Sequence, residues 1–370
     1  MVKIVRVDVE GRGYDIRIGD DFRTTLQVAG EGRSALVVAD THTGPLYAQE
    51  VQQVLTAGGY VCSYFEIPAG ETSKSLAQLG AVLERAVGAG LDRKSLIVAL
   101  GGGVVGDLAG FAAAVYLRGV SFLQIPTSLL AMVDSAVGGK TGINLPQGKN
   151  LVGAFYQPMA VGIHLDTLHS LPEREYRSGL AEVVKYGIIY DADFFAFLER
   201  EQAALLRRDR DVLASVVARC CEIKAEVVGK DEREGGLRAI LNYGHTLGHA
   251  IEAVGGYGAL LHGEAIAIGM VYANGVSQAV TGLSQSECVR VETLLTAFGL
   301  PVSLPHAFGW EALRDVMSAD KKADRRVPTF VLAEALGKVR FGCQVPEEVL
   351  ATIYARFAGR MDRTCRCESE

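Results

Sequence analysis

Residues 95–107 read SLIVALGGGVVGD, and this stretch decides the fold. The apolar residues at 96–100 predict a buried strand, the glycines at 101–103 predict a tight turn, and a helix is expected from about Val104. The glycines at 101, 103 and 106 fit the G-x-G-x-x-G spacing, which lets a backbone approach a pyrophosphate at a helix N-terminus. The same spacing also suits a close-packed turn, but the order of strand, turn and helix favours a nucleotide site.

Similar apolar runs lie on both sides of this stretch, at residues 35–39, 61–67, 121–125 and 161–165. Because these runs alternate with helical segments, they predict a parallel sheet with helices on both faces. We therefore expect an α/β N-terminal domain with a Rossmann-like parallel sheet over residues 1–171. The acidic residue that usually follows such a glycine turn by about 20 residues is absent. Asp40, at the end of an earlier strand, is the candidate for holding a ribose.

The spacing of the apolar residues changes near Pro172. From there to about residue 298 the apolar residues recur at helical spacing, and a short strand is expected near residues 329–333. The sequence therefore predicts a mainly α-helical C-terminal domain over residues 172–370. We expect a disordered tail from about residue 360.

Composition narrows the class of protein. The chain has 370 residues, 49% of them hydrophobic and 22% charged, which is typical of a globular protein. Its net charge of −6 argues against a nucleic-acid or anionic-membrane binder. Residues 96–117 are apolar enough for a membrane span, but the glycines and Asp107 favour a buried strand, turn and helix instead. An odd number of cysteines, seven, indicates reduced thiols and a cytoplasmic location.

A histidine cluster suggests a metal site. His245 and His249 lie four residues apart, so that they share one face of a helix, and His262 follows shortly after. Glu182 stands among apolar residues, where a carboxylate needs a partner. Imidazoles combined with one carboxylate suit catalytic zinc. The alternative partner for Glu182 is Lys185, three residues further along the same predicted helix.

Several cations stand in apolar or glycine-rich surroundings. They are Arg118, Lys140, Lys149, Lys224 and Arg238. Taken one by one they suit solvated surface charges, but together in an acidic protein they indicate a pocket for an anion.

These residues and their neighbours resemble the 3-dehydroquinate synthase family of sugar-phosphate cyclases. The resemblance runs from about residue 36 to about residue 341, and it is most specific at residues 67–71 with Lys74, 101–107, 125–150, 179–187, 231–249 and 262–270. Two positions depart from the family pattern: Ser128 stands where a second threonine is frequent, and Arg326 stands where glycine is common.

The resemblance implies an enzyme that uses NAD and one divalent metal, Zn²⁺ or Co²⁺. Such an enzyme is a lyase of the shikimate pathway and converts 3-deoxy-D-arabino-heptulosonate 7-phosphate to 3-dehydroquinate and phosphate. The implied metal ligands are Glu182, His245 and His262. His249, which spacing alone would pair with His245, is implied to handle phosphate and protons instead.

The resemblance also assigns the remaining site residues. The implied cofactor site comprises Asp40, Glu71, Thr72, Ser73, Lys74, Gly102, Gly103, Val104, Val105, Gly106, Asp107, Thr127, Ser128, Lys140, Lys149, Thr167, Leu168, His169 and Ser170. The implied substrate residues are Arg118, Asp134, Lys140, Asn150, Lys185, Lys224, Arg238, Asn242 and one of Lys321 and Lys322. The implied catalytic residues are His249, Glu234, Lys140, Lys185 and Asn150. Arg118 matches an arginine that reaches into a partner subunit, which implies a homodimer.

Three other functions compete with this interpretation. A cyclase acting on sedoheptulose 7-phosphate would meet no carboxylate, which would leave Lys224 and Arg238 without a purpose. A metal-dependent polyol dehydrogenase would release NADH and need no phosphate pocket, and Lys140, Asn150 and His249 argue against it. A non-catalytic paralogue that only binds a metabolite would be expected to have lost part of its ligand set.

Overall fold

The computed structural model describes residues 2–9, 11, 13–26, 33–256, 259–304, 308–319 and 328–359. The chain forms two compact units, one of Met1–Pro172 with Arg208–Arg233 and the other of Glu173–Arg207 with Glu234–Glu370. Helix α8 (Arg210–Lys230), which lies within the predicted C-terminal domain, thus belongs to the first unit. It does so because it packs against strand β1 (Lys3–Val7).

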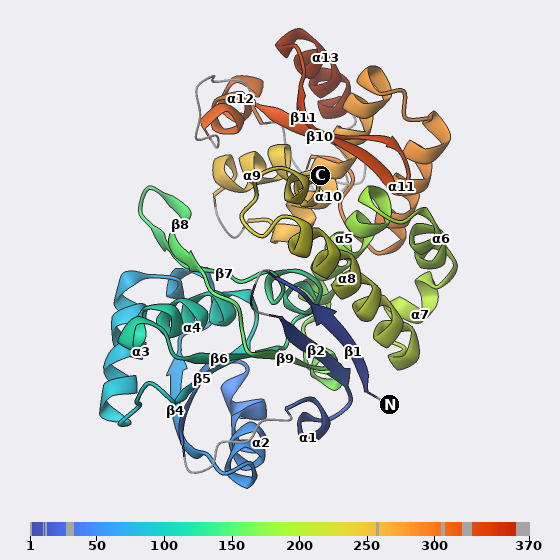
Figure 1. Cartoon of the computed structure of the whole chain (residues 1–370). Coiled ribbons are helices and arrows are strands. Elements are labelled where there is room, and N and C mark those ends of the chain that lie inside the picture. The colour runs from blue at the N-terminus through green and yellow to red at the C-terminus, as the bar shows by residue number, and fades with distance from the viewer. Residues whose placement is uncertain are drawn as a thin grey trace, which may run out of the picture. The chain divides into compact units, whose positions relative to one another are not determined.

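The first unit is built on a seven-stranded sheet, whose strands Figure 1 draws in blue and green. Every neighbouring pair is parallel except β1 with β2. The fold class expected from the sequence is therefore confirmed. In spatial order the strands are β1, β2 (Tyr14–Gly19), β9 (Ala160–His164), β6 (Ser121–Pro126), β5 (Leu96–Gly101), β3 (Ser34–Asp40) and β4 (Val61–Ile67).

Helices cover both faces of this sheet. In β3, Leu36 and Val38 join one hydrophobic cluster and Val37 joins the other, because successive side chains of a strand point to opposite faces. A strand buried on both faces reads as a continuous apolar run, which is why these strands stood out in the sequence. The covering helices are α1 (Phe22–Thr25), α2 (Gly44–Ala57), α3 (Leu76–Gly88) and α4 (Gly103–Val115).

The order of the strands reverses between β3 and β5. From β3 the chain continues to β4 on one side and then returns to β5 on the other. Asp40 ends β3 and Gly101 ends β5, so both stand at the carboxyl edge of the sheet at this switch point. Open α/β sheets bind their ligands there. A separate antiparallel hairpin, β7 (Lys140–Leu145) with β8 (Gly148–Phe155), belongs to the same unit.

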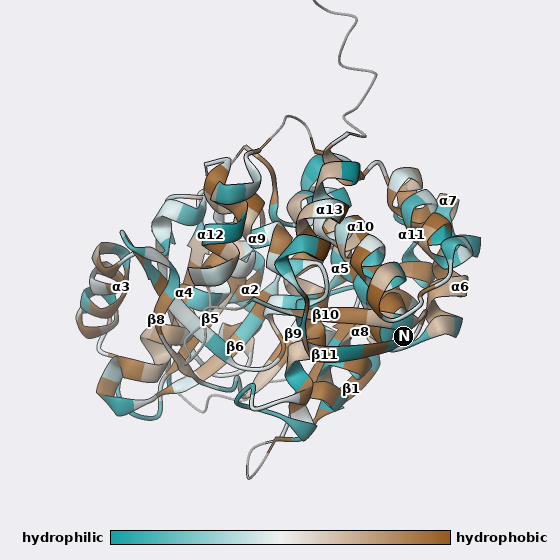
Figure 2. Cartoon of the chain, turned by 90° about the horizontal axis from the view of Figure 1, so that it is seen from above, coloured by the Kyte–Doolittle hydropathy of each residue, from teal (hydrophilic) through white to brown (hydrophobic). Residues whose placement is uncertain are grey.

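The second unit is mainly helical, as expected. Figure 2 shows that helices such as α13 carry both hydrophobic and hydrophilic residues, as expected of a helix with one buried face. The strand expected near residues 329–333 is β10 (Thr329–Ala335), and it pairs with β11 (Lys338–Gln344). The helices are α5 (Glu173–Ile189), α6 (Ala192–Arg200), α7 (Gln202–Leu206), α9 (His245–Val254), α10 (His262–Val280), α11 (Gln285–Ala297), α12 (Trp310–Ala319) and α13 (Glu347–Ala358).

The long apolar stretch at residues 96–117 is resolved as strand β5, the glycine turn and helix α4, as expected. Within the part of the chain that the structure describes, no helix has the length and apolar character needed to cross a membrane. The expected tail from about residue 360 lies outside the described residues.

Candidate active site

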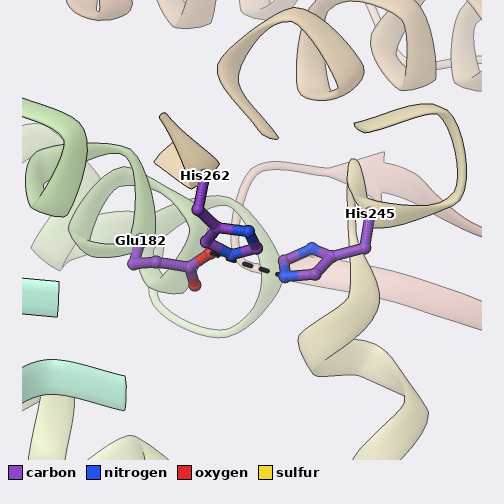
Figure 3. A group of neighbouring side chains, drawn as sticks. All are labelled: Glu182, His245 and His262. Carbon is purple, nitrogen blue, oxygen red and sulfur yellow. Dashed lines mark ion pairs between the residues drawn. The ribbon is translucent and has the colours of Figure 1, made fainter. Parts of the chain in front are cut away.

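Three helices of the second unit bring Glu182, His245 and His262 together. Glu182 lies in the middle of α5, His245 begins α9 and His262 begins α10. Oε1 of Glu182 is 3.5 Å from Nε2 of each histidine, and one ligand atom from each residue lies within 4.8 Å of the others. Figure 3 shows the two rings converging on the carboxylate. A carboxylate oxygen and two imidazole nitrogens at these separations form a donor set that fits a divalent metal.

Each histidine is held from behind by a hydrogen-bond acceptor. Nδ1 of His245 is 3.0 Å from the carbonyl oxygen of Tyr243, and Nδ1 of His262 is 3.3 Å from Oε2 of Glu252. Because a carbonyl or carboxylate oxygen can only accept, each Nδ1 carries the proton. In the neutral ring the lone pair then lies on Nε2, on the side of Glu182, as a metal ligand requires.

The surroundings of this cluster are buried and charged. Glu182 is fully buried and forms an ion pair with Lys185. Burial and the nearby Lys185 ammonium hold the pKa of His245 well below its usual value, which keeps that ring neutral. Burial also acts to lower the pKa of His262, but the neighbouring carboxylates of Glu182 and Glu252 outweigh it and raise that pKa to about 9. The sequence analysis gave Glu182 two alternatives, a metal site shared with the histidines or an ion pair with Lys185. Glu182 lies close enough to all of these residues for both.

Close helix packing places the two histidines. A Cβ atom on Gly263, next to His262, would clash with the backbone oxygen of Ser178 on α5. A Cβ atom on Gly269 of α10 would clash with the backbone oxygen of Gly244, immediately before His245. The absence of side chains at these two glycines therefore allows α5, α9 and α10 to approach closely enough for the cluster to form.

His249 lies beside this group but outside it. Its ring centroid is 5.2 Å from that of His245 and 6.0 Å from that of His262. Ligand atoms of His249 fall into a second group, with Glu252 and His262. The spacing of four residues therefore identified neighbouring rings, whereas the group that contains Glu182 is the one implied by the resemblance.

Glu252 was missed by the sequence analysis. It follows His249 by three residues and His245 by seven on α9, and residues at these spacings share one face of a helix. That periodicity was the available signal.

Other predicted residues of the second unit are placed as follows. Arg238 and Asn242 lie on the short helix η5 (Leu237–Asn242), and Arg238 is 1% exposed. Glu234 has a φ of +60°, an uncommon conformation for a residue other than glycine. Lys321 and Lys322, as well as Arg326, lie outside the described residues.

In the first unit, the glycine turn and Asp40 meet at the switch point. Oδ1 of Asp40 accepts hydrogen bonds from the backbone N–H groups of His42 and Thr43, at 3.0 and 2.8 Å. Gly102 precedes helix α4 without a side-chain cap, and a Cβ atom on Gly103 would lie 3.1 Å from Oγ of Ser135. The turn thus leaves a cradle at a helix N-terminus that fits a pyrophosphate.

A buried lysine links several predicted residues of this unit. Nζ of Lys74, which is 5% exposed, donates to Oδ2 of Asp107 at 2.7 Å and to Oδ1 of Asn150 at 2.5 Å. Asn144, a residue missed from the sequence, donates to Oε1 of Glu71 at 2.7 Å and accepts from the backbone N–H of Asn150 at 2.8 Å. Burial raises the pKa of Asp107, although the Lys74 ammonium opposes this effect.

Lys224 and Asp134 form a second pair in the first unit. Nζ of Lys224 donates to the carboxylate and to the backbone oxygen of Asp134, at 2.7 and 2.6 Å. Asp134 lies in a π-helical turn, η3 (Ala131–Ser135), a feature frequent at functional sites.

The remaining predicted residues of the first unit lie on the β7–β8 hairpin, on short turns and in helix α4, which contains Val104, Val105 and Gly106. Lys140 and Lys149 lie on the β7–β8 hairpin, while Thr127 and Ser128 follow β6. Arg118 ends the turn η2 (Tyr116–Arg118) with a φ of +69° and is exposed. Glu71, Thr72 and Ser73 form η1 (Glu71–Ser73), and Thr167, Leu168 and His169 lie in η4 (Leu165–His169) before Ser170.

Comparisons with known proteins agree with this architecture. The family model for the N-terminal part of 3-dehydroquinate synthase matches residues 64–178, and the model for its C-terminal part matches residues 179–323. A 3-dehydroquinate synthase from Geobacter metallireducens is 51% identical over 340 residues, which are 91% of this chain and 94% of the relative.

Two solved structures are similar over nearly their whole length. A 2-deoxy-scyllo-inosose synthase, complexed with carbaglucose-6-phosphate, NAD⁺ and Co²⁺, has a TM-score of 0.87 at 26% identity and covers 95% of this chain and 99% of its own. A 2-epi-5-epi-valiolone synthase from Streptomyces hygroscopicus subsp. jinggangensis, with NAD⁺ and Zn²⁺ bound, has a TM-score of 0.86 at 25% identity and covers 94% and 97%.

The fold, the clusters described above and these matches define an enzyme of the sugar-phosphate cyclase class. Within that class, the chain belongs to the 3-dehydroquinate synthase family.

Proposed function

We propose that this chain converts 3-deoxy-D-arabino-heptulosonate 7-phosphate to 3-dehydroquinate and phosphate, as a carbon–oxygen lyase that depends on NAD and on one divalent metal. The observation that carries the proposal is the group of Glu182, His245 and His262, with both Nε2 atoms directed at the same carboxylate. An intact ligand set of this kind argues against a paralogue that has lost catalysis.

Glu182, His245 and His262 would hold the metal, Zn²⁺ or Co²⁺. When bound, the metal supplies Lewis acidity that stabilises the substrate's alkoxide oxygens. Tyr243 and Glu252 keep the histidine rings in the tautomer that binds a metal. Two similar cyclases that carry NAD⁺ with Co²⁺ or Zn²⁺ support the same choice of cofactors here.

The carboxyl edge of the sheet would hold NAD, with its pyrophosphate at the glycine turn of α4 and its ribose near Asp40. NAD bound there would supply the capacity for hydride transfer to and from the substrate. Lys74 holds Asp107 and Asn150 in fixed positions, and Asn144 holds the backbone of Asn150. These contacts already hold Asp107 and Asn150 in place without the cofactor, in the positions in which they would face it.

The substrate carries a phosphate and a carboxylate, so its recognition needs cations. In the proposed reaction, a ketone at C5 would acidify the C6 proton, so that phosphate could leave from C7. Reduction of that ketone, opening of the ring and an aldol step would then close the carbocycle. His249 would bind phosphate and move the C6 proton, and Glu234 would accept a proton. Lys140, Asn150, Lys185 and Arg238 would bind the substrate.

The roles of the two domains follow from these assignments. Residues 1–171 would hold NAD, and residues 172–370 would hold the metal and much of the substrate. We further propose a homodimer in which Arg118 reaches the site of the partner subunit. The exposed position of Arg118 suits a residue that acts outside its own chain. A cytoplasmic location stays a prediction from the cysteine content.

The experiment that tests this function is a comparison of two substrates. The purified chain is given NAD and Zn²⁺ and either the heptulosonate 7-phosphate or sedoheptulose 7-phosphate, and the release of inorganic phosphate is measured. We expect phosphate release from the heptulosonate alone. Release from sedoheptulose 7-phosphate at an equal or higher rate would contradict the proposal and favour the other cyclase activity.

A further inference from the structure

Glu252 occupies a position between two histidines of the second unit. Its side chain is 9% exposed, and its Oε2 lies 3.3 Å from Nδ1 of His262. A ligand atom of Glu252 also lies within 4.8 Å of a ring nitrogen of His249. Glu252 comes from α9 and His262 from α10. This contact therefore joins the two helices that carry the histidines of the metal group, by which we mean Glu182, His245 and His262.

The two histidines of the metal group are held by acceptors of different charge. His245 is held by the neutral backbone oxygen of Tyr243, whereas His262 is held by a carboxylate. A carboxylate that accepts from Nδ1–H increases the electron density at Nε2, and thereby the strength with which Nε2 binds a cation. A backbone carbonyl does this less, because it carries no net charge. The contribution of Glu252 is therefore not duplicated on the His245 side.

The burial of the Glu252 carboxylate also restrains the ring of His262. A carboxylate removed from water needs a compensating partner, and the Nδ1–H group of His262 supplies one. In turn, a histidine whose Nδ1 is fixed cannot rotate its ring without breaking that hydrogen bond. The orientation of Nε2 toward Glu182 at 3.5 Å thus depends on Glu252 as well as on the backbone of α10.

We propose that Glu252 is a positioning residue of the metal centre, which fixes the ring of His262 and increases its affinity for a divalent cation without itself touching the cation. The inference rests on the metal site of the proposed function. It adds a residue that neither the sequence motifs nor the resemblance had assigned.

The test is a metal titration of the protein rather than an assay of its reaction. Metal-free wild-type protein and the variants Glu252→Gln and Glu252→Ala are titrated with Zn²⁺ against a chromophoric chelator. The matched control is Glu199→Gln, which removes a carboxylate of the same unit that pairs with Arg290 on α11. We expect Glu252→Ala to bind Zn²⁺ about 10- to 100-fold more weakly. Glu252→Gln should lose less, because its amide oxygen still accepts from Nδ1–H, and the control should bind as the wild type does.

A second readout reports on geometry. The visible absorption spectrum of the Co²⁺-loaded protein depends on the orientation of its ligands, so it should change in both Glu252 variants and stay unchanged in Glu199→Gln. Thermal melting of the metal-free proteins identifies any variant that fails to fold, and the nearly isosteric Glu252→Gln keeps the test valid if Glu252→Ala does so.

Two results would overturn the inference. One is an unchanged Zn²⁺ affinity and an unchanged Co²⁺ spectrum in folded Glu252 variants. The other is a second equivalent of metal in the wild type that disappears in the variants while the first is bound with unchanged affinity, because Glu252 would then be a ligand of a separate site with His249. A wild-type chain that binds no metal at all would contradict the proposed function itself, which is a distinct result.

Discussion

The carboxyl edge of the sheet in the first unit and the histidine cluster in the second unit gather their polar residues in different ways. At the sheet edge, parallel strands end side by side, so that Asp40 and the glycine turn meet because of strand order alone. In the cluster, Glu182, His245 and His262 meet because glycines allow three helices to approach closely. The first arrangement follows from topology, whereas the second depends on packing.

The two regions also differ in how deeply their charged side chains are buried. At the sheet edge, Lys74 is paired with Asp107, which remains partly exposed. In the cluster, Glu182 and Lys185 are fully or almost fully buried. Buried ion pairs cost free energy of desolvation, so they persist where they hold a ligand or fix a geometry. The difference indicates that substitutions in the cluster should have the more drastic effects.

The largest effect is expected from removal of a metal ligand. His262→Ala should lose the bound metal and nearly all activity, because two ligands remain where three are needed. His249→Ala should keep about one metal per chain and lose activity only. Elemental analysis of both purified variants, with activity before and after addition of Zn²⁺, provides the measurement. The reverse pattern would contradict the account and restore the pair of His245 and His249.

A smaller effect is expected from substitution of the buried Arg238. Arg238→Ala should weaken binding of the heptulosonate, because loss of one partner of a desolvated charge pair costs about 2–5 kcal/mol, or about 30- to several-thousand-fold in affinity. Lys224→Ala should act in the same direction and also leave the Asp134 carboxylate without this partner. Equilibrium binding of the substrate is the measurement. Normal binding by both variants would show that the substrate's carboxylate has been assigned to the wrong residues.

At the sheet edge, substitutions should change the requirement for NAD. Asp107→Asn weakens the charged hydrogen bond from Lys74, and Lys149→Ala removes a cation of the hairpin. Each should raise the NAD concentration needed for half-maximal activity by about 10- to 150-fold, since hydrogen bonds to charged groups contribute about 1.5–3 kcal/mol. Kinetics with NAD and substrate varied in turn make the comparison. A larger change in the substrate requirement would place the cofactor on other residues.

The smallest effects concern the glycines of helix interiors. Gly269→Ala should lower the free energy of unfolding by about 1–3 kcal/mol and weaken Zn²⁺ binding, because the new Cβ atom would push α10 away from Gly244. The matched control is Gly80→Ala on α3, where a Cβ atom meets open space and the better helix former should stabilise the protein by up to about 1 kcal/mol. Denaturant unfolding measures both. A Gly269→Ala protein that is as stable as the wild type would refute the packing argument.

Most of the fold could be predicted from the sequence because its strands are buried on both faces. Such strands read as apolar runs, and their alternation with helices implied the parallel sheet. The position of α8 could not be predicted, because its helical periodicity says only that one face is buried and does not identify the partner, which is β1. The sequence also displayed directly that Asp40 ends a strand, as it does in β3, whereas its contact with a ribose stays a prediction.

The spacing of residues along the sequence predicted less of the candidate site than the apolar runs predicted of the fold. The four-residue interval pairs His245 with His249 on one helix, whereas the structure groups His245 with residues of two other helices. Glu182 attracted attention only because a carboxylate is unusual among apolar neighbours. Glu252 contacts His262, and Asn144 contacts Glu71 and the backbone of Asn150. The helical spacing of Glu252 from His245 and His249 was a signal in the sequence, whereas nothing in the sequence around Asn144 distinguishes it from an ordinary surface polar residue.

The proposed enzyme oxidises and then reduces the same bound substrate, and the recycling of NAD tests this property most directly. The metal-loaded enzyme is given the heptulosonate in large excess over NAD, and phosphate and NADH are followed together. We expect phosphate in large molar excess over the added NAD, with only a small transient in NADH absorbance. Accumulation of NADH in step with consumed substrate, without release of phosphate, would contradict it and identify a dehydrogenase.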